Sequence, residues 1–221
     1  MEFKPLESAE NAFPSPIPEP TLRRLPVYHN YLKTPAVAEQ GAISCTQIAQ
    51  DLHLTSIQVR KDLALTGIIG KPKTGYNPLA LRQAIEDFLG WNNPNEALLF
   101  GAGHLGQALL SYNGFKNYGL DIVAGVDPDP SKQGPGPNGK QIVPLEKAAG
   151  LLRRLHIELA IIAVPEAAAQ ATADLCVSCG VKAIWNFAPV KVRVPAHVSV
   201  LHENLASSLA VLSKKLVRRR A

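Results

Sequence analysis

Three glycines with a fixed spacing constrain this chain more than any other feature. Gly101, Gly103 and Gly106 follow the apolar run 97–100 and precede a segment with helical periodicity. In a strand–turn–helix unit, the first glycine allows a tight turn, the second lets the backbone approach a pyrophosphate, and the third lets helix and strand pack closely. The amino end of the helix then offers free N–H groups to phosphate oxygens. The spacing predicts a dinucleotide-binding Rossmann unit.

An aspartate after the next apolar run agrees with this interpretation. Asp127 lies 21 residues after Gly106 (127 − 106 = 21), near the spacing at which a Rossmann carboxylate binds both hydroxyls of the adenosine ribose. The same carboxylate repels a 2′-phosphate, so NAD(H) is favoured over NADP(H), and Asp129 is a candidate to share the role. A structural glycine turn in an empty Rossmann-like fold is the alternative.

The second half of the chain alternates between short apolar runs and helical segments, which is typical of a parallel sheet covered on both faces. In such a sheet the ligand lies beyond the carboxyl ends of the strands. We therefore expect Val164, Pro165, Asn186, Phe187 and Ala188 to line the nicotinamide side, although these positions also suit ordinary loop packing. The expected strands are 97–100, 122–126, 141–143, 159–164, 183–185 and 198–201; the expected helices are 104–112, 145–155, 166–179 and 203–219; 134–139 is an expected loop.

The first half contains two helix-capping boxes, Ser44-x-x-Gln47 and Thr55-x-x-Gln58, which begin 11 residues apart (55 − 44 = 11). In such a box the first hydroxyl caps the amino end of a helix. Only residues 51–54 remain for the connection, which predicts a tight helix-turn-helix. Two further helices are expected: one starts at the cap Thr21 with Leu22, Leu25, Tyr28 and Leu32 inward, and one runs from the cap Asn77 to Gly90.

The second capped helix has the chemistry of a DNA-reading helix. Polar and basic side chains lie away from its expected core face of Val59 and Leu63, and a recognition helix presents such residues to the major groove near its amino end. A solvated charged helix is the alternative. The candidate contacts are Ser56, Gln58, Arg60 and Lys61.

A glycine- and lysine-containing stretch from Gly67 to Tyr76 predicts a small β-wing, in which Lys71 and Lys73 suit phosphate contacts. Over residues 55–76, four basic residues against Asp62 give a local net charge of +3 (4 − 1 = 3). A single module buries too little surface for strong specificity, so a dimer on palindromic DNA is expected.

Composition excludes several protein classes. Hydrophobic residues make up 46% and charged residues 19%, so the chain is expected to be globular. The formal net charge of +5 is weak support for nucleic-acid binding, because five basic residues near the C-terminus account for it. They are Lys214, Lys215, Arg218, Arg219 and Arg220.

No export or membrane segment is expected. Residues 1–20 lack a basic segment followed by an apolar run, and the apolar stretch 159–164 is far short of the roughly 18 residues that span a bilayer. Three cysteines, Cys45, Cys176 and Cys179, are few and odd in number, which favours a reducing cytoplasm. The last two lack the second pair of a zinc site, so we expect them to pack in the core.

Catalysis is not expected. A hydride-transfer enzyme needs a general acid or base beside the nicotinamide, whereas His104 lies inside the glycine loop and the later histidines have no nearby carboxylate in sequence. The residues after Pro94 form one nucleotide-binding domain and leave no substrate domain. Two alternatives stay open, an NAD-dependent oxidoreductase and a CoA- or nucleotide-binding module.

From about Ile17 to Lys215 the chain resembles the Rex family of redox-sensing transcriptional repressors of bacteria. Together the matching motifs are more specific than a Rossmann fingerprint alone. They are Arg24-Leu-Pro-Val-Tyr28, Gln58-Val-Arg-Lys-Asp-Leu63, Gly75-Tyr76, Gly101-Ala-Gly-His-Leu-Gly106, Tyr112-Asn-Gly-Phe115 and Asn186-Phe-Ala-Pro189.

The resemblance implies an α/β chain with a winged-helix domain, a Rossmann NAD(H)-binding domain and a C-terminal helix exchanged between the subunits of a homodimer. It implies binding to double-stranded operator DNA when NADH is scarce, with NAD+ compatible with binding, and release by NADH. The targets would be fermentation and respiration genes. On this basis residues 203–216 form the exchanged helix, and Leu205 approaches the partner's nicotinamide site.

Two positions depart from the family pattern. Family members often have an arginine where this chain has Asn30 and an aspartate where it has Asn204. With the tyrosine that matches Tyr112, these charged residues form a network that differs between the NAD+ and NADH states. Because both charged residues of the pair are replaced here, neither charge is left without its partner. Either Asn30, Tyr112 and Asn204 form a neutral substitute, or coupling runs through other contacts.

The chain is thus expected to comprise a mobile arm (1–16), a winged-helix domain (17–91), a Rossmann domain (96–201) and an exchanged helix with a basic tail (202–221). We expect no catalytic or metal-binding residues. The expected cofactor residues are Gly101, Ala102, Gly103, His104, Leu105, Gly106, Tyr112, Asp127, Val164, Pro165, Asn186, Phe187 and Ala188; the expected DNA contacts are Ser44, Ser56, Gln58, Arg60, Lys61, Lys71, Lys73 and Tyr76.

Overall fold

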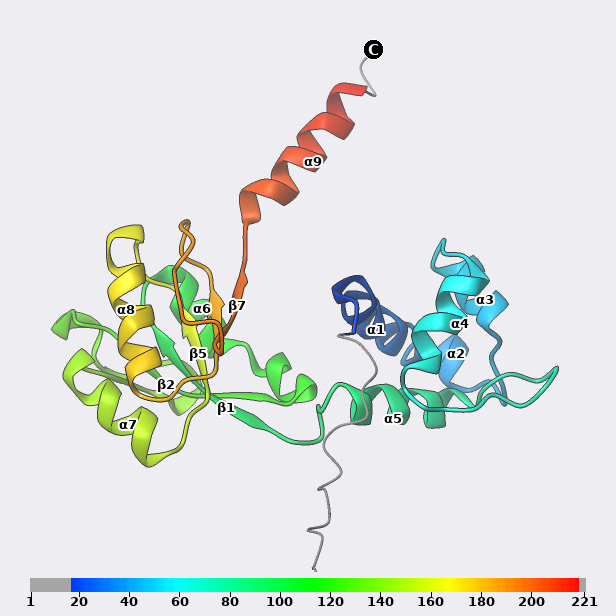
Figure 1. Cartoon of the computed structure of the whole chain (residues 1–221), viewed down its shortest axis with the longest axis horizontal. Coiled ribbons are helices and arrows are strands. Elements are labelled where there is room, and N and C mark those ends of the chain that lie inside the picture. Colours follow the sequence, from blue (N-terminus) through cyan, green and yellow to red (C-terminus); the bar gives the residue numbers. More distant parts are fainter. Residues whose placement is uncertain (1–16, 219–221) are drawn as a thin grey trace, which may run out of the picture. The chain divides into compact units, whose positions relative to one another are not determined.

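The computed structural model describes residues 17–218, which divide into two compact units at the boundary between Gly90 and Trp91 (Figure 1). The expected arm, residues 1–16, and the last three residues of the basic tail lie outside the described residues.

The first unit is helical, and both capping boxes cap their helices as predicted. Ser44 Oγ accepts from the backbone N–H of Gln47 at 3.1 Å, and Thr55 Oγ1 accepts from that of Gln58 at 3.2 Å. The predicted helix-turn-helix is therefore present as α3 and α4. The helices are α1 (Glu19–Leu32), α2 (Pro35–Ala38), α3 (Cys45–Asp51), α4 (Ser56–Ala64) and α5 (Pro78–Phe88), the last capped by Asn77.

The wing is smaller than a regular hairpin. It consists of two isolated bridges, which pair Lys71 with Gly75 and Ile43 with Tyr76. At Gly75 the backbone has φ +96° and an added Cβ would lie 2.2 Å from the carbonyl oxygen of Ile43. Only glycine allows this approach, which joins the wing to the loop before α3.

The start of α1 differs from the sequence-based expectation. The helix begins at Glu19, and Thr21 lies inside it as a buried residue rather than capping it. Leu22, expected to face inward, is 37% exposed. The reason is tertiary, because the Thr21 hydroxyl donates to the buried Asp62 at 2.8 Å, which turns this position toward α4 and its neighbour toward solvent.

Asp62 joins α4 to α1. Its carboxylate accepts from Arg24 Nε at 2.7 Å, from Arg24 Nη2 at 2.8 Å and from the Tyr28 hydroxyl at 2.7 Å, besides the bond from Thr21. Burial would raise the pKa of Asp62, but these hydrogen bonds outweigh burial and hold the pKa below its usual value. The acidic charge counted against the basic residues of this segment therefore faces inward.

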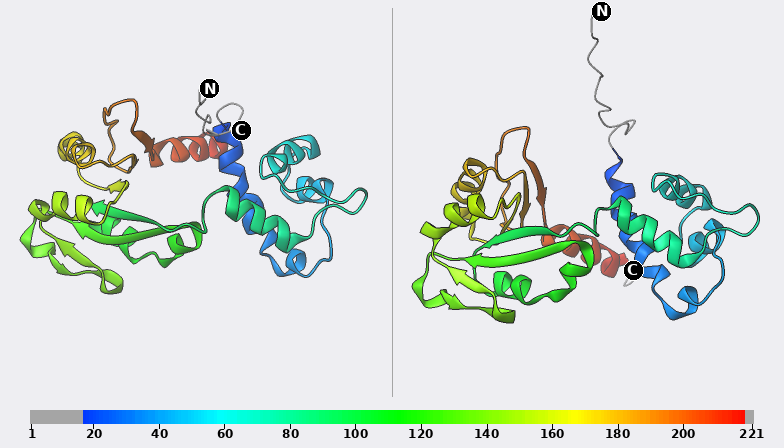
Figure 2. Two further views of the ribbon diagram at one scale, coloured as in Figure 1. Left: turned by 60° about the horizontal axis from the view of Figure 1, so that its bottom comes forward. Right: turned by 90° about the horizontal axis from the view of Figure 1, so that it is seen from below.

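The second unit is a seven-stranded sheet with helices on both faces (Figure 2). The strand order β3-β4-β2-β1-β5-β6-β7 is that of a Rossmann fold with one added antiparallel edge strand. The strands are β1 (Asn95–Phe100), β2 (Leu120–Val126), β3 (Gly134–Pro135), β4 (Gln141–Val143), β5 (Leu159–Ile162), β6 (Ala183–Asn186) and β7 (Ser199–His202).

Alternation along β1 divides the core between the two faces. Leu98 and Phe100 pack in the cluster that includes Leu152 of α7 and Ala169 of α8, whereas Leu99 packs on the opposite side with Leu110 of α6. The parallel sheet covered on both faces is therefore confirmed. The helices are α6 (His104–Ser111), α7 (Ala148–Arg154), α8 (Glu166–Ser178) and α9 (Leu205–Arg218), with short 3₁₀ segments at Asn113–Tyr118, Pro130–Lys132, Pro137–Gly139 and Leu145–Lys147.

The expected loop at 134–139 is the main difference in this unit. Gly134–Pro135 pairs with β4, and Pro137–Gly139 forms a 3₁₀ turn. The backbone hydrogen bond from Gly136 N to Lys140 O, 2.7 Å, closes this turn on β4, a contact that a composition of Gly and Pro does not reveal. The expected strand 159–164 ends earlier, at Ile162.

The cysteines are buried, and burial raises the pKa of Cys176 to about 12. A thiol with so high a pKa is inert at neutral pH, in agreement with the expected packing role. Within residues 17–218, no helix is long and apolar enough to cross a bilayer.

The Asp62→Asn variant should lower the free energy of unfolding by about 3 kcal/mol at pH 7, because it leaves the guanidinium of Arg24 without its counter-charge. The folded-state pKa of Asp62 is lowered, so its contribution is present above the unfolded-state value of about 4 and is lost as the pH falls through the folded value. Urea unfolding measured at pH 7 and under progressively more acidic conditions should therefore show the two proteins converging in acid.

Glu19→Gln is the matched control, since Glu19 forms an exposed ion pair with Arg23 on the same helix. Its effect should stay below about 1 kcal/mol. A loss of less than about 1 kcal/mol in Asp62→Asn at pH 7 would contradict the role assigned to this carboxylate.

Candidate functional site

The glycine turn is packed as its spacing predicts. Gly101 has φ +95°, and an added Cβ there would lie 2.5 Å from the carbonyl oxygen of Ala163. At Gly106 an added Cβ would lie 1.8 Å from the carbonyl oxygen of Gly101. The first glycine therefore lets β1 turn beside β5, and the third lets α6 pack on the turn.

Gly103 is different, because an added Cβ would meet nothing within 4 Å. This glycine is the residue that precedes α6, and its φ of −71° is allowed to any residue. The absence of a side chain thus leaves open space at the amino end of a helix, where N–H groups favour anions. His104 and Leu105, which follow, are exposed. The turn fits a pyrophosphate.

Asp127 lies at the end of β2 and braces this turn. Its carboxylate accepts from the backbone N–H of Ala102 at 2.7 Å and from that of Asp129 at 2.9 Å, and Lys132 Nζ lies 3.4 Å away. The side chain is 5% exposed. Both oxygens already have protein partners, so a ribose contact uses only their remaining lone pairs and stays a prediction. Asp129 is more accessible, and hydrogen bonds from Ser131 lower its pKa.

Strand order reverses between β1 and β5, where the crevice of an open α/β sheet takes its ligand. Half-buried Val164 and exposed Pro165 follow β5 at this edge. The structure thus brings the glycine turn and the segment after β5 together, as the backbone hydrogen bond from Ala163 N to Phe100 O, 2.8 Å, also shows.

Asn186 ends β6 and is fully buried. Its Nδ2 donates to the carbonyl of Val190 at 2.7 Å and lies 3.0 Å from His202 Nδ1, while its Oδ1 accepts from the backbone N–H of Ala188 at 3.1 Å. The amide is therefore used to shape the loop that carries Phe187. This geometry favours a supporting role for Asn186 over the direct nicotinamide contact that the sequence suggested.

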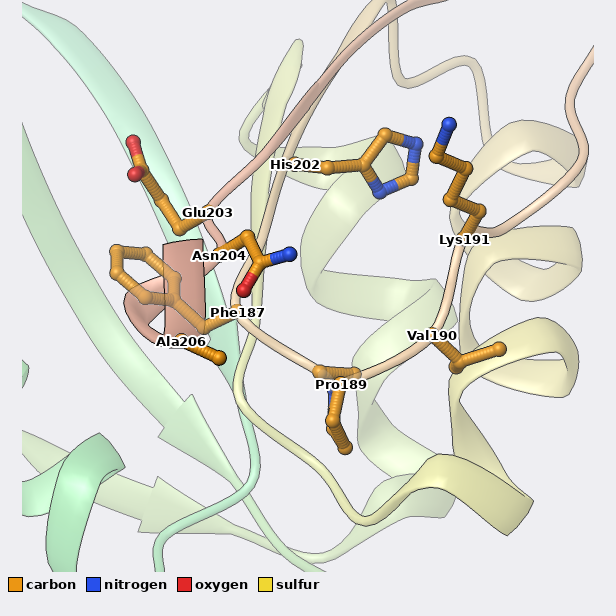
Figure 3. A pocket seen from close by; sticks show the side chains of 9 residues that line it. Phe187, Pro189, Val190, Lys191, His202, Glu203, Asn204 and Ala206 are labelled. Carbon is orange, nitrogen blue, oxygen red and sulfur yellow. The ribbon is translucent and has the colours of Figure 1, made fainter. Parts of the chain in front are cut away.

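A pocket of about 560 Å³ opens beside this loop (Figure 3). Phe187 and Ala188 of the loop line it, together with Glu203 and Asn204, which precede α9. The expected switch residue Tyr112 directly follows α6 in the same unit and is 54% exposed. Its ring lies edge-on to that of Phe115, with the ring centroids 4.8 Å apart.

The outward face of α4 is basic and also apolar. Val59 and Leu63 are buried, whereas Arg60 and Lys61 are exposed. Ile57 lies on the same outward side, four residues before Lys61, and is 65% exposed. Ile57 is absent from the expected contacts because these were all polar or charged residues; an isoleucine off the core face of a capped helix is the sequence signal that marks it.

The other expected DNA contacts are spread around this helix. Ser56 and Gln58 are half-buried on α4, and Lys71 and Lys73 are exposed in the wing. Ser44 caps α3, and the ring of Tyr76 lies against Gly70, where an added Cβ would come within 2.9 Å of it. Burial, and then the neighbouring Cys45, raise the pKa of the Tyr76 hydroxyl. These contacts lie in one unit but serve partly as framework.

Helix α9 has an apolar side that the described chain does not cover. Leu209, Leu212 and Leu216 are 63%, 58% and 62% exposed. The side chain of Leu205 lies outside those that the structure describes. Asn30 and Asn204 are exposed residues of different units, so their association with Tyr112 stays a prediction. Among the described residues, no group of three or more His, Cys, Asp or Glu is placed to hold a metal.

Comparison with known families agrees with the two-unit organisation. A model described as a putative DNA-binding protein N-terminus matches residues 16–64, and a model of the CoA binding domain matches residues 92–190.

Relatives match across both units. The redox-sensing transcriptional repressor Rex of Treponema denticola is 45% identical over 193 residues, which is 87% of this chain and 92% of that protein. The crystal structure of RSP in complex with beta-NAD+ and operator DNA has a TM-score of 0.86 and 30% identity, and covers 94% of this chain and 95% of its own. That of RSP in complex with beta-NADH has a TM-score of 0.84, 30% identity, and coverages of 94% and 97%. The chain therefore belongs to the Rex family of redox-sensing transcriptional repressors.

Proposed function

We propose that this protein binds palindromic operator DNA as a homodimer and is released from it by NADH, so that repression follows the NADH/NAD+ ratio. The observation that carries the proposal is a likeness over 94% of the chain to RSP, a protein solved with beta-NAD+ and operator DNA and also with beta-NADH.

In the DNA-reading unit, α4 would enter the major groove with its outward face. Arg60 and Lys61 are free to approach bases and phosphates, and the exposed Lys71 and Lys73 extend the basic surface along the wing. The inward bonding of Asp62 supports this role, because it removes the acidic side chain from the surface that would face the polyanion.

In the second unit, the turn from Gly101 to Gly106 would hold the pyrophosphate of NADH or NAD+, and Asp127 or Asp129 the adenosine ribose. Val164, Pro165, Phe187 and Ala188 would lie on the nicotinamide side. The open space at Gly103 and the tight packing at Gly106 support this assignment.

The exposed leucines of α9 suit burial against a second copy of the chain, as expected of an exchanged helix that joins a dimer. We place the protein in the cytoplasm and assign it no catalysis, since its relatives are named as repressors. The match of residues 92–190 to a CoA binding domain reflects the shared Rossmann half, and the position of Asp127 suits a ribose diol better than a phosphorylated ribose.

A band-shift titration tests the whole proposal. NADH should release a palindromic operator fragment from the protein at a much lower concentration than NAD+, because a ligand shifts two states only by its differential affinity for them. Indifference of DNA binding to both cofactors would refute the proposal, and substrate-dependent turnover of NADH would support an oxidoreductase instead.

Two glycine variants separate cofactor binding from folding. Gly103→Ala should keep the wild-type Tm but weaken NADH binding at least about tenfold, because its methyl group occupies the space proposed for the phosphates. Gly106→Ala should lower the Tm itself, since backbone lies 1.8 Å from the added Cβ. Calorimetric titration and thermal unfolding measure the two effects.

Gly150→Ala on α7 is the control, with nothing within 4 Å of the added Cβ, and should leave both quantities at or above the wild-type level. Unchanged NADH affinity in Gly103→Ala would argue against pyrophosphate binding at this turn.

Ile57 is proposed to touch a thymine methyl group in the operator, as apolar side chains do in the major groove. Ile57→Ala should weaken operator binding about fourfold, the equivalent of about 0.8 kcal/mol for one buried methyl group. Replacing the contacted dT by dU should lower the operator affinity of the wild type by the same factor and should not lower that of Ile57→Ala any further. Equilibrium binding to a set of singly substituted operators measures both effects.

Leu79→Ala is the matched control, because Leu79 is 59% exposed on α5 rather than on α4. Additive losses at every dT position in Ile57→Ala would exclude the methyl contact.

A further inference from the structure

A side-chain hydrogen bond joins β6, which leads into the loop beside the proposed nicotinamide site, to the segment before α9. The indole Nε1 of Trp185, on β6, donates to Glu203 Oε1 at 3.0 Å. Both side chains are half-buried, and Glu203 follows the last residue of β7. The backbone reinforces the link, because Glu203 N donates to the carbonyl of Asn186 at 2.8 Å.

The ring of Trp185 also belongs to a row of aromatic side chains. Its centroid lies 4.8 Å from that of Phe187 and 5.6 Å from that of Phe115, which in turn lies 4.8 Å from that of Tyr112. Phe187 lines the pocket of Figure 3, and Tyr112 is the expected switch residue. Trp185 therefore contacts Phe187 directly and Tyr112 through Phe115, and its indole also bonds to Glu203, which leads into α9.

The position of Glu203 explains why this bond matters. Asn204 is the one residue between Glu203 and α9, so the bond from Trp185 fixes the point at which the chain leaves the sheet. His202, the preceding residue, is tied to Asn186 by the 3.0 Å contact between Nδ1 and Nδ2. The loop that carries Phe187 and the start of α9 are thus connected through directional hydrogen bonds, which weaken steeply when their angle changes.

We infer that Trp185 and Glu203 are positioning residues that transmit occupancy of the cofactor site to α9, and through α9 to the partner subunit. The inference rests on the proposed function. A ligand that moves Phe187 displaces the indole packed against it, and the indole N–H then pulls on or releases the Glu203 carboxylate. This route uses neither Asn30 nor Asn204. It is therefore a way to couple the two sites without the charged pair that family members often have at these positions.

The experiment measures coupling rather than binding alone. The Kd for NADH is determined for the full-length protein with and without a saturating operator fragment, and the ratio of the two values is the coupling between the sites. Trp185→Phe keeps a ring but removes the donor, and Glu203→Ala removes the acceptor. Each should reduce the ratio at least about fivefold. In Trp185→Phe, whose side chain does not line the pocket, the Kd of the DNA-free protein should change less than about twofold.

Three further variants sharpen the test. Glu203→Gln keeps an acceptor oxygen and should retain most of the ratio. The double variant Trp185→Phe with Glu203→Ala should lose no more than either single variant, because both remove the same bond. Glu158→Ala is the matched control. Glu158 directly precedes β5, at the opposite end of the strands, and forms an exposed ion pair with Lys182. In this variant the ratio should stay at the wild-type value.

Separate outcomes distinguish the two levels of the proposal. A wild-type ratio close to one would refute the proposed function itself. A wild-type protein that responds, with Trp185→Phe and Glu203→Ala retaining its ratio, would overturn only the inference. Loss of NADH affinity in the DNA-free variants with an unchanged ratio would assign the pair a structural role and overturn the inference as well.

Discussion

Burying a carboxylate costs several kcal/mol unless donors surround it. Within residues 17–218, each unit buries one carboxylate, and each lies beside a segment to which a binding role is proposed. Asp62 accepts from Arg24, Tyr28 and Thr21, and so holds α4, the proposed recognition helix, on α1. Asp127 accepts two backbone N–H groups and holds the glycine turn beside β2. Because each charge is satisfied only in one arrangement, each carboxylate fixes the geometry of the surface next to it.

The glycine turn and the loop after β6 both lie at the carboxyl edge of the sheet. The turn is set by the close approach of Gly106 to Gly101, and the loop by the buried amide of Asn186. Both leave their outer faces open: the turn at Gly103, where phosphates are proposed to bind, and the loop at the pocket lined by Phe187. A rigid inner framework with an open outer face is what a cofactor sensor requires, since only differential contacts shift its states.

Features that depend on residues close together in the sequence were predictable. The capping hydroxyls of Ser44 and Thr55 and the packing of the glycine turn appear as expected, because each depends on neighbours only three to five positions away. Edge pairing of Gly134–Pro135 was missed, since glycine and proline favour loops. Ile57 and the bond from Trp185 to Glu203 were also missed, since neither residue type marks a site by itself.

The sequence by itself therefore determined the division into a helical unit and a Rossmann unit, the helix-turn-helix of α3 and α4, and the glycine turn before α6. The tertiary structure decided which polar groups form hydrogen bonds inside the protein and which stay exposed to binding partners. Thr21 and Asp62 are 41 positions apart, so no local pattern shows that the helix start becomes a buried donor or that an acidic side chain leaves the basic surface. The packing of the helices and strands determines which donors surround a buried charge, because it brings together residues that are distant in sequence.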